Sequence, residues 1–494
     1  MRLALNPFAF TRAQLALCHA GLVVIAASWL LGGIGPKLEW IVALLASPSL
    51  ALLIAEGRSR FHSGDLPGFR RLLRWSTPLA LLVLLVVISS LNPSHRPAFL
   101  YNTYVLRPIP HIEWLPSTAL PSSSLRILAC FGSLACVGLT LAFCVHTGRH
   151  LRALMLVLCL NTLALAVLGS LQHKTGAAGP YFGSWVTPNP KWFATFLYHN
   201  HWGAFAILST AASLGLVFRS LQRTSPHPWL SGSGPLLTLC AAIIVASIPL
   251  SSSRSCTVLI ALLVTIAIAG AFNHILRFPR KTGLDPQRGL LATTALLTSL
   301  FLLVSLITWQ SRDILSARID QTLRQLDPDL SLRSDATLYE KAETYGRTTL
   351  YADTWNLAAA RPVFGWGLDT FGLIFLGRNS MSSELKKQNV FEDAHSDWLQ
   401  ALAEIGFLGT FLLLLFALLP LLETLRRSLI NPLSGWLLGG CTLIAAYAWL
   451  EFPFANPAVV ALWWVSWFTA LRCLQLGSND RLLRSANACS PSSS

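Results

Sequence analysis

Residues 393–422 read DAHSDWLQALAEIGFLGTFLLLLFALLPLL, a polar cluster that passes directly into a long apolar run. The run from Phe407 to Leu422, with the residues just before it, is long enough to cross about 30 Å of hydrocarbon as a helix. His395 stands at its polar end. The stretch therefore predicts a membrane helix that begins beside a titratable histidine, where water-borne and lipid-borne molecules meet.

Apolar runs of this kind recur along the whole chain of 494 residues. Hydrophobic residues make up 53% of the sequence and charged residues 12%, whereas about a quarter of the residues in a soluble domain are charged. Isolated spans satisfy their own backbone hydrogen bonds as helices, and the alternating pattern of a membrane barrel is absent. The predicted fold class is all-α: a polytopic membrane protein of about 12 transmembrane helices with a large helical extracytoplasmic loop. The spans lie near 13–33, 38–55, 77–91, 125–145, 151–171, 202–218, 235–250, 256–276, 288–309, 404–422, 434–450 and 456–473.

The basic residues predict which side of the membrane each loop faces. They gather in alternate short loops and at both chain ends, at Arg58, Arg60, Arg70, Arg71, Arg74, Arg149, Arg152, Arg219, Arg223, Arg277, Arg280, Lys281, Arg288, Arg426, Arg427, Arg2, Arg12, Arg472, Arg481 and Arg484. The positive-inside rule makes that side, and both termini, cytoplasmic. The loops 92–124, 172–201, 251–255, 310–395 and 451–456 then face outward. This signal accounts for most of the net charge of +15, and no basic run interleaved with aromatics indicates nucleic acid.

The expected organisation follows from the spans and the long outer loop. It comprises N-terminal membrane helices (1–190), central membrane helices with an outer arginine turn (191–309), the extracytoplasmic loop domain (310–395), C-terminal membrane helices (396–475) and a disordered cytoplasmic tail (476–494). The ten cysteines show no CxxC pair and no Cys/His spacing of a zinc site. Neither a disulfide framework, nor a metal, nor a cofactor is therefore expected.

The outer loop 310–395 is too long for a simple connection, and its excess of basic residues is free to serve an anionic ligand. Helices are predicted at about 312–326 and 335–360. The second ends at Arg361-Pro362, because the residue before a proline resists the helical conformation. Three glycines within 363–372 predict a tight turn whose backbone approaches another group closely.

His395 is a candidate general base, because an imidazole exchanges protons near physiological pH. If the helix begins near Asp393, the histidine lies in its first turn, where the helix dipole attracts anions. The alternative is a histidine that only caps the helix or hydrogen-bonds a neighbour. Glu404 is expected to pair with a neighbouring helix, and Gly406 and Gly409 to let this helix pack closely against another.

Three further residues are candidates for binding. Arg254 lies in the serine-rich turn 251–255 close to hydrocarbon, where a guanidinium together with hydroxyls suits a phosphate. The alternative is an arginine whose side chain only snorkels to the membrane interface. Arg347 lies on the second loop helix, where a solvated helix face is the plainer interpretation. Asn200 follows interfacial aromatics, which indicates an anchor first and substrate positioning second.

These residues together resemble a known family. A histidine followed by Ser, then nine residues and Gly-x-x-Gly, at the outer start of a late span, is similar to the signature of bacterial O-antigen ligases and related polysaccharide polymerases. Three other features agree: Ser253-Arg254-Ser255 on an outer turn, Arg347 ahead of the Pro-x-x-Gly-x-Gly turn at 362–367, and Asn200 at the start of a middle span. The match covers residues 190–420 well, and the first 180 by hydropathy alone.

The resemblance implies a metal-independent glycosyltransferase in the bacterial inner membrane, with its site facing the periplasm and a donor linked to undecaprenyl pyrophosphate. By that analogy Arg254 and Arg347 hold the pyrophosphate, and His395 removes the proton of the acceptor hydroxyl. Asn200, Ser253 and Arg361 are the further candidates for substrate binding. The implied partners are the lipid-linked glycan, membrane lipids, and lipid A-core or another glycan or protein hydroxyl as acceptor, with no nucleic acid.

Several alternatives share these residues or this topology. An exopolysaccharide polymerase and a protein O-oligosaccharyltransferase use the same site and differ in the acceptor. A transporter or flippase of lipid-linked glycans is the alternative from another class, weakly indicated by Pro249 and Glu404 inside spans. The large outer loop argues against it. The long proline-containing outer segment 92–124 departs from the family pattern and has no predicted role.

Overall fold

The computed structural model describes residues 11–100, 103–187, 189–221, 234–277, 347–381, 391–426 and 430–488. Nine helices in these ranges are long and apolar enough to cross a membrane, counting 36–62 as one span, and two shorter apolar helices accompany them. The protein is therefore an all-α polytopic membrane protein, as predicted. The expected span at 288–309 and the expected loop helix at 312–326 lie outside the described residues.

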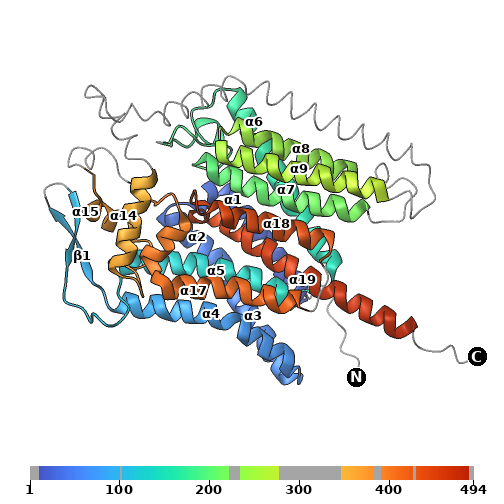
Figure 1. Ribbon diagram of the computed structural model, residues 1–494, viewed down its shortest axis with the longest axis horizontal. Coiled ribbons are helices and arrows are strands. Elements are labelled where there is room, and N and C mark those ends of the chain that lie inside the picture. Colours follow the sequence, from blue (N-terminus) through green and yellow to red (C-terminus); the bar gives the residue numbers. More distant parts are fainter. Residues whose placement is uncertain are drawn as a thin grey trace, which may run out of the picture.

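The elements are arranged as one helical bundle with a small structure at one end (Figure 1). The α-helices are α1 Arg12–Trp29, α2 Pro36–Ala46, α3 Pro48–His62, α4 Leu66–Leu91, α5 Pro121–Cys144, α6 Gly148–Lys174, α7 His199–Leu221, α8 Gly234–Leu250, α9 Arg254–Arg277, α14 Arg347–Ala360, α15 Phe371–Arg378, α17 Asp397–Leu425, α18 Pro432–Tyr447 and α19 Pro457–Ala488. The 3-10 turns are η1 Leu31–Gly33, η2 Tyr181–Gly183 and η4 Pro453–Ala455, and the strands are β1 His95–Leu100 and β2 Thr103–Pro108.

Helices α5, α7 and α19 form the centre of the bundle. The apolar windows of α7 and α19 are 89% and 83% buried, and α19 packs extensively on α5. Gly138 on α5 faces the backbone of Trp464 on α19, so closely that a Cβ at this position would collide with it. Small residues that let two helix backbones approach are the usual basis of packing in lipid, where hydrophobic burial between helices contributes little.

Several helices extend beyond the apolar runs that predicted them. α4 begins at Leu66, about three turns before the predicted span, and α17 begins at Asp397, about two turns before it. A hydropathy scan detects only the hydrocarbon-length part of a helix, whereas the polar turns before it continue the same hydrogen-bond ladder. α19 likewise continues to Ala488, so the helix covers much of the tail 476–494 that was expected to be disordered.

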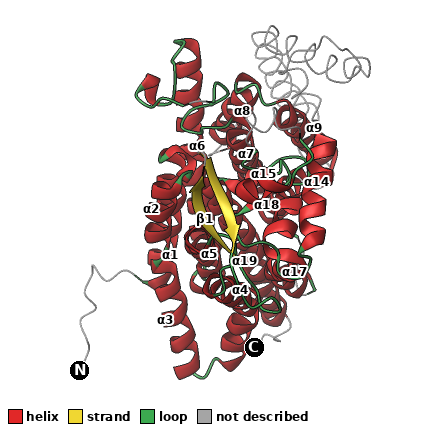
Figure 2. Cartoon of the chain, turned by 90° about the vertical axis from the view of Figure 1, so that its left-hand side faces the viewer, coloured by secondary structure: helices red, strands yellow, loops and turns green. Residues whose placement is uncertain are grey.

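The outer segment 92–124 contains an antiparallel hairpin of β1 and β2, which the all-helical expectation did not include (Figure 2). Its register pairs His95 with Pro108 and Leu100 with Thr103. Strands of six residues are too short to appear in a search for membrane-length apolar runs. The hairpin lies with α14 and α15 at one end of the bundle, called the hairpin end below (Figure 1).

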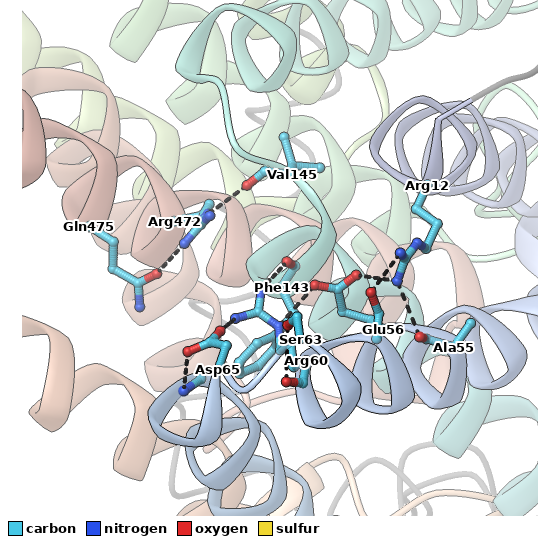
Figure 3. Close-up of polar contacts among 12 residues, drawn as sticks. Arg12, Ala55, Glu56, Arg60, Ser63, Asp65, Phe143, Val145, Arg472 and Gln475 are labelled. Carbon is cyan, nitrogen blue, oxygen red and sulfur yellow. Dashed lines mark hydrogen bonds and ion pairs between the residues drawn. The ribbon is translucent and has the colours of Figure 1, made fainter. Parts of the chain in front are cut away.

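Arginines gather at the opposite end of α5 and neutralise the ends of the helices there (Figure 3). Arg60 binds Glu56 and Asp65 and donates to the Phe143 carbonyl at 2.9 Å. Arg472 donates to the Val145 carbonyl at 2.6 Å, and Arg12 also pairs with Glu56. Basic side chains on the last carbonyls of a helix satisfy groups without a partner in the helix and favour its negative end. Arg12, Arg60 and Arg472, assigned to one membrane side by sequence, thus meet at one end of the bundle.

Candidate active site

The site begins at the start of α17. The Ser396 hydroxyl accepts from the backbone N–H of Leu399 at 3.4 Å and caps the helix, which begins at Asp397. The Asp397 carboxylate accepts from the backbone N–H of Phe454 at 2.8 Å and fixes this helix start to η4. His395 therefore precedes the helix, and the expectation that it lies in the first helical turn is wrong, because the serine, a strong N-cap residue, follows it.

His395 is held on three sides. Its backbone has φ of +50°, a left-handed conformation that is uncommon for a residue with a side chain. The Tyr351 hydroxyl donates to its carbonyl at 2.9 Å, and the ring stands edge-on to Phe452 with centroids 4.7 Å apart. Its Nδ1 lies 3.4 Å from a carboxylate oxygen of Glu451, and the side chain remains 29% exposed. A strained residue held by its surroundings in this way is typical of a functional site.

Glu451 joins His395 to Arg347. It lies between α18 and η4, and its side chain is 2% exposed. One carboxylate oxygen pairs with the Arg347 guanidinium, and the other faces His395 Nδ1 and the Tyr198 hydroxyl, each at 3.4 Å. Burial acts to raise the pKa of Glu451, but the hydrogen bond from His395 and the charge of Arg347 outweigh it and lower that pKa. A buried, ionised carboxylate thus contacts both the imidazole of His395 and the guanidinium of Arg347.

Sequence reasoning missed Glu451. It is a lone acid in the apolar stretch Trp449-Leu450-Glu451-Phe452, a short connection between two hydrophobic spans. A charge so close to hydrocarbon needs a partner or a ligand, and this holds for the Glu451 carboxylate as it does for Arg254. That signal was available, but the partner itself is 104 residues away in the chain.

Arg347 is fixed at the first described residue of α14. Its Nη1 donates to the Leu450 carbonyl at 2.9 Å, beside the ion pair with Glu451. Burial lowers the pKa of Arg347, and the charge of Glu451 more than compensates and raises it. Half of the side chain is exposed. A guanidinium has five N–H donors, so the side chain keeps donors for a ligand while Glu451 orients it.

Two more of the predicted residues join the same network. Tyr198, which donates to Glu451, accepts from Asn200 Nδ2 at 2.8 Å. The side-chain amide oxygen Oδ1 of Asn200 accepts from the Ser253 hydroxyl at 2.5 Å. Burial and the Glu451 charge raise the pKa of Tyr198, so its hydroxyl stays a donor. Arg254 follows Ser253 directly, begins α9 and is exposed.

Arg361 lies apart from this network. It follows the last residue of α14, whereas Arg347 is the first described one, so the two are roughly 20 Å apart along the helix. Its Nη1 donates to the hydroxyls of Ser94 and Ser117 at 3.3 and 2.9 Å. The length of α14 thus separates Arg361 from His395 and Arg347, and its expected part in substrate binding stays a prediction.

The glycine turn is the close approach that the sequence predicted, and its partner is the first part of α17. α14 ends at Ala360, as expected from Arg361-Pro362. Gly365 and Gly367 have φ of +70° and +107°, and a Cβ on Gly365 would collide with the Glu404 backbone. The backbone N–H of Trp366 donates to the Ala403 carbonyl at 2.9 Å. The turn therefore docks α14 onto the helix that follows His395.

Two expectations about α17 are corrected by this contact. The Glu404 carboxylate accepts from the backbone N–H groups of Asp369 and Phe371, at 2.9 and 3.1 Å, instead of pairing with a neighbouring membrane helix. Gly406 interrupts the helix with φ of +64° and packs against the backbone of Val363 in the turn. Gly409 faces Ile405 of its own helix. Gly406 serves the contact with the turn, because the turn needs backbone within van der Waals distance of α17.

A cavity of about 420 Å³ opens beside this helix start, between α4, α5, α17 and α19. Its lining combines apolar side chains, such as Leu82, Phe131 and Trp464, with carboxyl groups that include Asp393 and Asp397, on either side of His395 in the sequence. Burial raises the pKa of Asp393 to about 6, against the opposing effect of His395. Carboxyl groups bind hydroxyls, and the apolar wall suits a hydrocarbon chain.

The arrangement can carry out proton transfer next to a bound anion. If Nδ1 of His395 donates to the Glu451 carboxylate, the imidazole is fixed in one tautomer and Nε2 becomes the basic atom, directed away from Glu451. Arg347, held by Glu451, and Arg254, which follows Ser253 of the same network, carry the positive charge that an anionic group requires. These are the requirements of a base-assisted transfer from a phosphate-bearing donor.

Comparison with known proteins supports one family. Residues 239–414 match the family model described as O-antigen ligase. The matched range runs from α8 to α17 and includes Arg254, Arg347 and His395, whereas Glu451 and Asn200 lie outside it. No curated protein matches the chain. The chain is thus a multi-pass membrane protein that carries, at residues 239–414, a domain of the O-antigen ligase family, whose reaction is ligase- or polymerase-type transfer of lipid-linked glycans.

Proposed function

We propose that this protein transfers a glycan from undecaprenyl pyrophosphate to an acceptor hydroxyl on the outer face of the bacterial inner membrane, as in O-antigen ligation to lipid A-core. The observation that carries the proposal is Glu451, buried between His395 and Arg347. One carboxylate holds the candidate base and a candidate ligand of the pyrophosphate beside each other. A purely structural ion pair has no need of the histidine, nor of its left-handed backbone.

His395 acts as the general base. Its Nε2 takes the proton of the acceptor hydroxyl while the acceptor oxygen attacks the anomeric carbon of the donor sugar. A new glycosidic C–O bond forms, and the bond from the anomeric carbon to the pyrophosphate oxygen breaks. Undecaprenyl pyrophosphate leaves with that electron pair, and Glu451 stabilises the imidazolium until its proton passes to solvent or to the leaving group.

Arg254 and Arg347 stabilise the pyrophosphate. Guanidinium forks match phosphate oxygens in pairs, and fixed positive charge near the breaking bond lowers the barrier most in a partly desolvated site. Glu451 keeps Arg347 in position before the donor arrives. Ser253 and Asn200 hold Tyr198 in place by successive hydrogen bonds, and Tyr198 in turn contacts Glu451. The apolar wall of the cavity between α4, α5, α17 and α19 suits a lipid chain, and its carboxyl groups suit sugar hydroxyls.

The site faces outward in this proposal. Arg12, Arg60 and Arg472 meet at one end of the bundle, and the positive-inside rule makes that end cytoplasmic. α5 runs from the hairpin end to those arginines, so the hairpin end, with α14 and the start of α17, is the outer end. Lipid-linked glycans on the outer leaflet then reach His395 laterally.

Replacing His395 with alanine tests the proposal. Glycan transfer in membranes is expected to fall at least about 100-fold, because general base catalysis contributes a factor of that size or more. Protein abundance and donor binding are expected to stay unchanged. His150→Ala, at an exposed histidine at the start of α6, is the matched control. Transfer by H395A at the wild-type rate would overturn the assignment.

The acceptor is identified by the glycans of a deletion strain. Ligation to lipid A-core predicts lipopolysaccharide without long glycan and accumulated polyprenyl-linked polymer. Accumulated single repeats would instead identify a polymerase, and loss of glycan from proteins alone a protein O-oligosaccharyltransferase. These outcomes separate the acceptors without changing the roles of His395 and Arg347.

A further inference from the structure

A second basic cluster lies at the hairpin end, past the end of α14. The cluster comprises Arg361 after α14, Arg378 at the end of α15, and His95 at the start of β1, around the buried ring of Trp366. The guanidinium carbons of Arg361 and Arg378 lie 4.1 and 4.4 Å from the ring centroid. The His95 ring lies 6.0 Å from it. Figures 1 and 2 show the three elements side by side.

The charges in this cluster are all of one sign. Among the residues that the structure describes, neither Arg361 nor Arg378 forms an ion pair with a carboxylate. Burial lowers the pKa of Arg361, and Arg378 lowers it further. Burial and then Arg361, Arg378 and His111 lower the pKa of His95. The guanidinium groups of Arg361 and Arg378 therefore repel each other, and a bound anion would relieve that repulsion.

The two guanidinium groups keep N–H donors that bind no residue in the described part of the chain. Both guanidinium carbons lie over the Trp366 ring, and this cation–π contact takes up no N–H donor. Arg361 donates through Nη1 to Ser94 and Ser117, and its Nε and Nη2 make no bond within the described ranges. Both serines are buried, so they fix the guanidinium rather than compete with a ligand. Trp366 is itself fixed by donating Nε1 to the Leu357 carbonyl at 2.9 Å.

We propose that Arg361 and Arg378, assisted by His95, form a second anion-binding site that takes a phosphate group of a membrane-bound ligand. A phosphate has enough oxygen atoms to accept from two guanidinium groups, whereas the two oxygens of a single carboxylate would leave some of their N–H donors without an acceptor. The site is roughly 20 Å from Arg347 along α14. A pyrophosphate bound at Arg347 cannot reach it, so the phosphate it takes belongs to another part of the ligand or to another molecule.

The source of that phosphate rests on the proposed function. If the protein glycosylates a phosphorylated glycolipid acceptor, the second site holds the acceptor some distance from the hydroxyl that reacts. The headgroup of an anionic phospholipid offers the same chemistry at the membrane surface. The binding chemistry is shared, and the experiment below distinguishes the two sources.

Binding of inorganic pyrophosphate tests the site without requiring catalysis. The full-length protein in phosphatidylcholine nanodiscs is expected to bind two pyrophosphates, one at Arg254 and Arg347 and one at the second site. Arg378→Gln, at an exposed side chain, is expected to weaken the second site at least about tenfold, since a charge-assisted hydrogen bond contributes that much. Arg361→Lys keeps the charge, loses the fork and is expected to weaken it as well. Arg149→Gln, also exposed, is the control.

The outcomes separate this site from the proposed active site. Wild-type binding by both R378Q and R361K would overturn the second site, whatever the activity of the protein. Loss of one pyrophosphate in R378Q, with no loss in R347A, would support the second site and contradict the proposed donor site. Competition by phosphatidylglycerol in the nanodisc identifies a lipid headgroup. A KM that rises when the acceptor is dephosphorylated, in wild type but not in R378Q, identifies the acceptor. If phosphatidylglycerol does not compete and dephosphorylation of the acceptor leaves KM unchanged, the proposal of a phosphate ligand is contradicted.

Discussion

At the scale of single residues, the site depends on a carboxylate between an imidazole and a guanidinium. Glu451 is nearly fully buried, and an unpaired charge there would be strongly destabilising. Arg347 neutralises it, while His395 stays partly exposed and chemically available. The same carboxylate can therefore orient a base and position an arginine. Replacing Arg347 alone removes the charge that neutralises the buried carboxylate.

The lowered pKa of Glu451 predicts how stability depends on pH. A carboxyl whose pKa in the folded protein is below its ordinary value of 4.5 stabilises the fold above that value. This stabilisation is lost as the pH falls through the lower, folded-state pKa. The melting temperature of wild type should exceed that of Glu451→Gln at pH 7, and the difference should shrink below about pH 4. A difference that stays constant down to pH 3 would contradict the ion pairing of Glu451.

The residues of the network were predictable one by one, but their connection was not. His395, Arg347, Asn200 and Ser253 each stand out by type and by position near a membrane boundary. The groups that join them, Glu451 and Tyr198, lie in segments that a hydropathy scan treats as gaps or aromatic belts. The pairing of Arg347 with Glu451 spans 104 residues, and no local pattern encodes a contact of that length. The distance of Arg361 from this network was not predictable for the same reason.

At the scale of elements, the glycine turn after α14 sets the position of α17. The sequence predicted the end of α14 and the need for close approach, because proline and glycine act on the backbone locally. It did not predict the partner, which is the backbone of Ala403 and Glu404. The hairpin escaped prediction because its strands are short. Thr118 lies against Gly367, and the Ala119 N–H donates to the Trp366 carbonyl, so the outer segment 92–124 has a structural role in supporting the turn.

Alanine at Gly365 tests the role of the turn. The backbone φ of +70° strains any residue with a side chain, by about 1–3 kcal/mol, and the new Cβ also meets the Glu404 backbone. Thermal unfolding in detergent should show a lower Tm for G365A, together with reduced glycan transfer. Gly377→Ala on α15 is the control, since a Cβ there meets nothing within 4 Å. Equal Tm values for the two variants would show that the turn does not fix α17.

At the scale of the whole molecule, the distribution of charge supports one orientation. Arginines neutralise helix ends at one end of the bundle (Figure 3), and the candidate active site lies toward the other. The sequence predicted this separation from loop composition, because the positive-inside rule depends only on local charge and span order. The depth at which His395 sits relative to the lipid is set by packing of distant helices, which composition does not specify.

Reporter fusions test the orientation. Alkaline phosphatase fused after Ile112, in the outer segment 92–124, should be active because the enzyme folds only outside the cytoplasm. A green fluorescent protein at the C-terminus should fluoresce, as that end is expected to be cytoplasmic. A fusion of phosphatase after Ser63, between α3 and α4, serves as the inactive control. The reverse pattern of activities would place His395 on the cytoplasmic side and contradict the proposed donor.

The central claim is that His395 and Glu451 act as one catalytic unit, and a double-mutant cycle on the transfer rate tests it most directly. Rates are measured for wild type, H395A, E451Q and the double variant, with donor and acceptor saturating. Because Glu451 acts partly through the imidazole and partly through Arg347, the account predicts that the double variant is slower than H395A, but by much less than the product of the two single losses. Losses that multiply in the double variant would show that the two residues act independently and would contradict the claim.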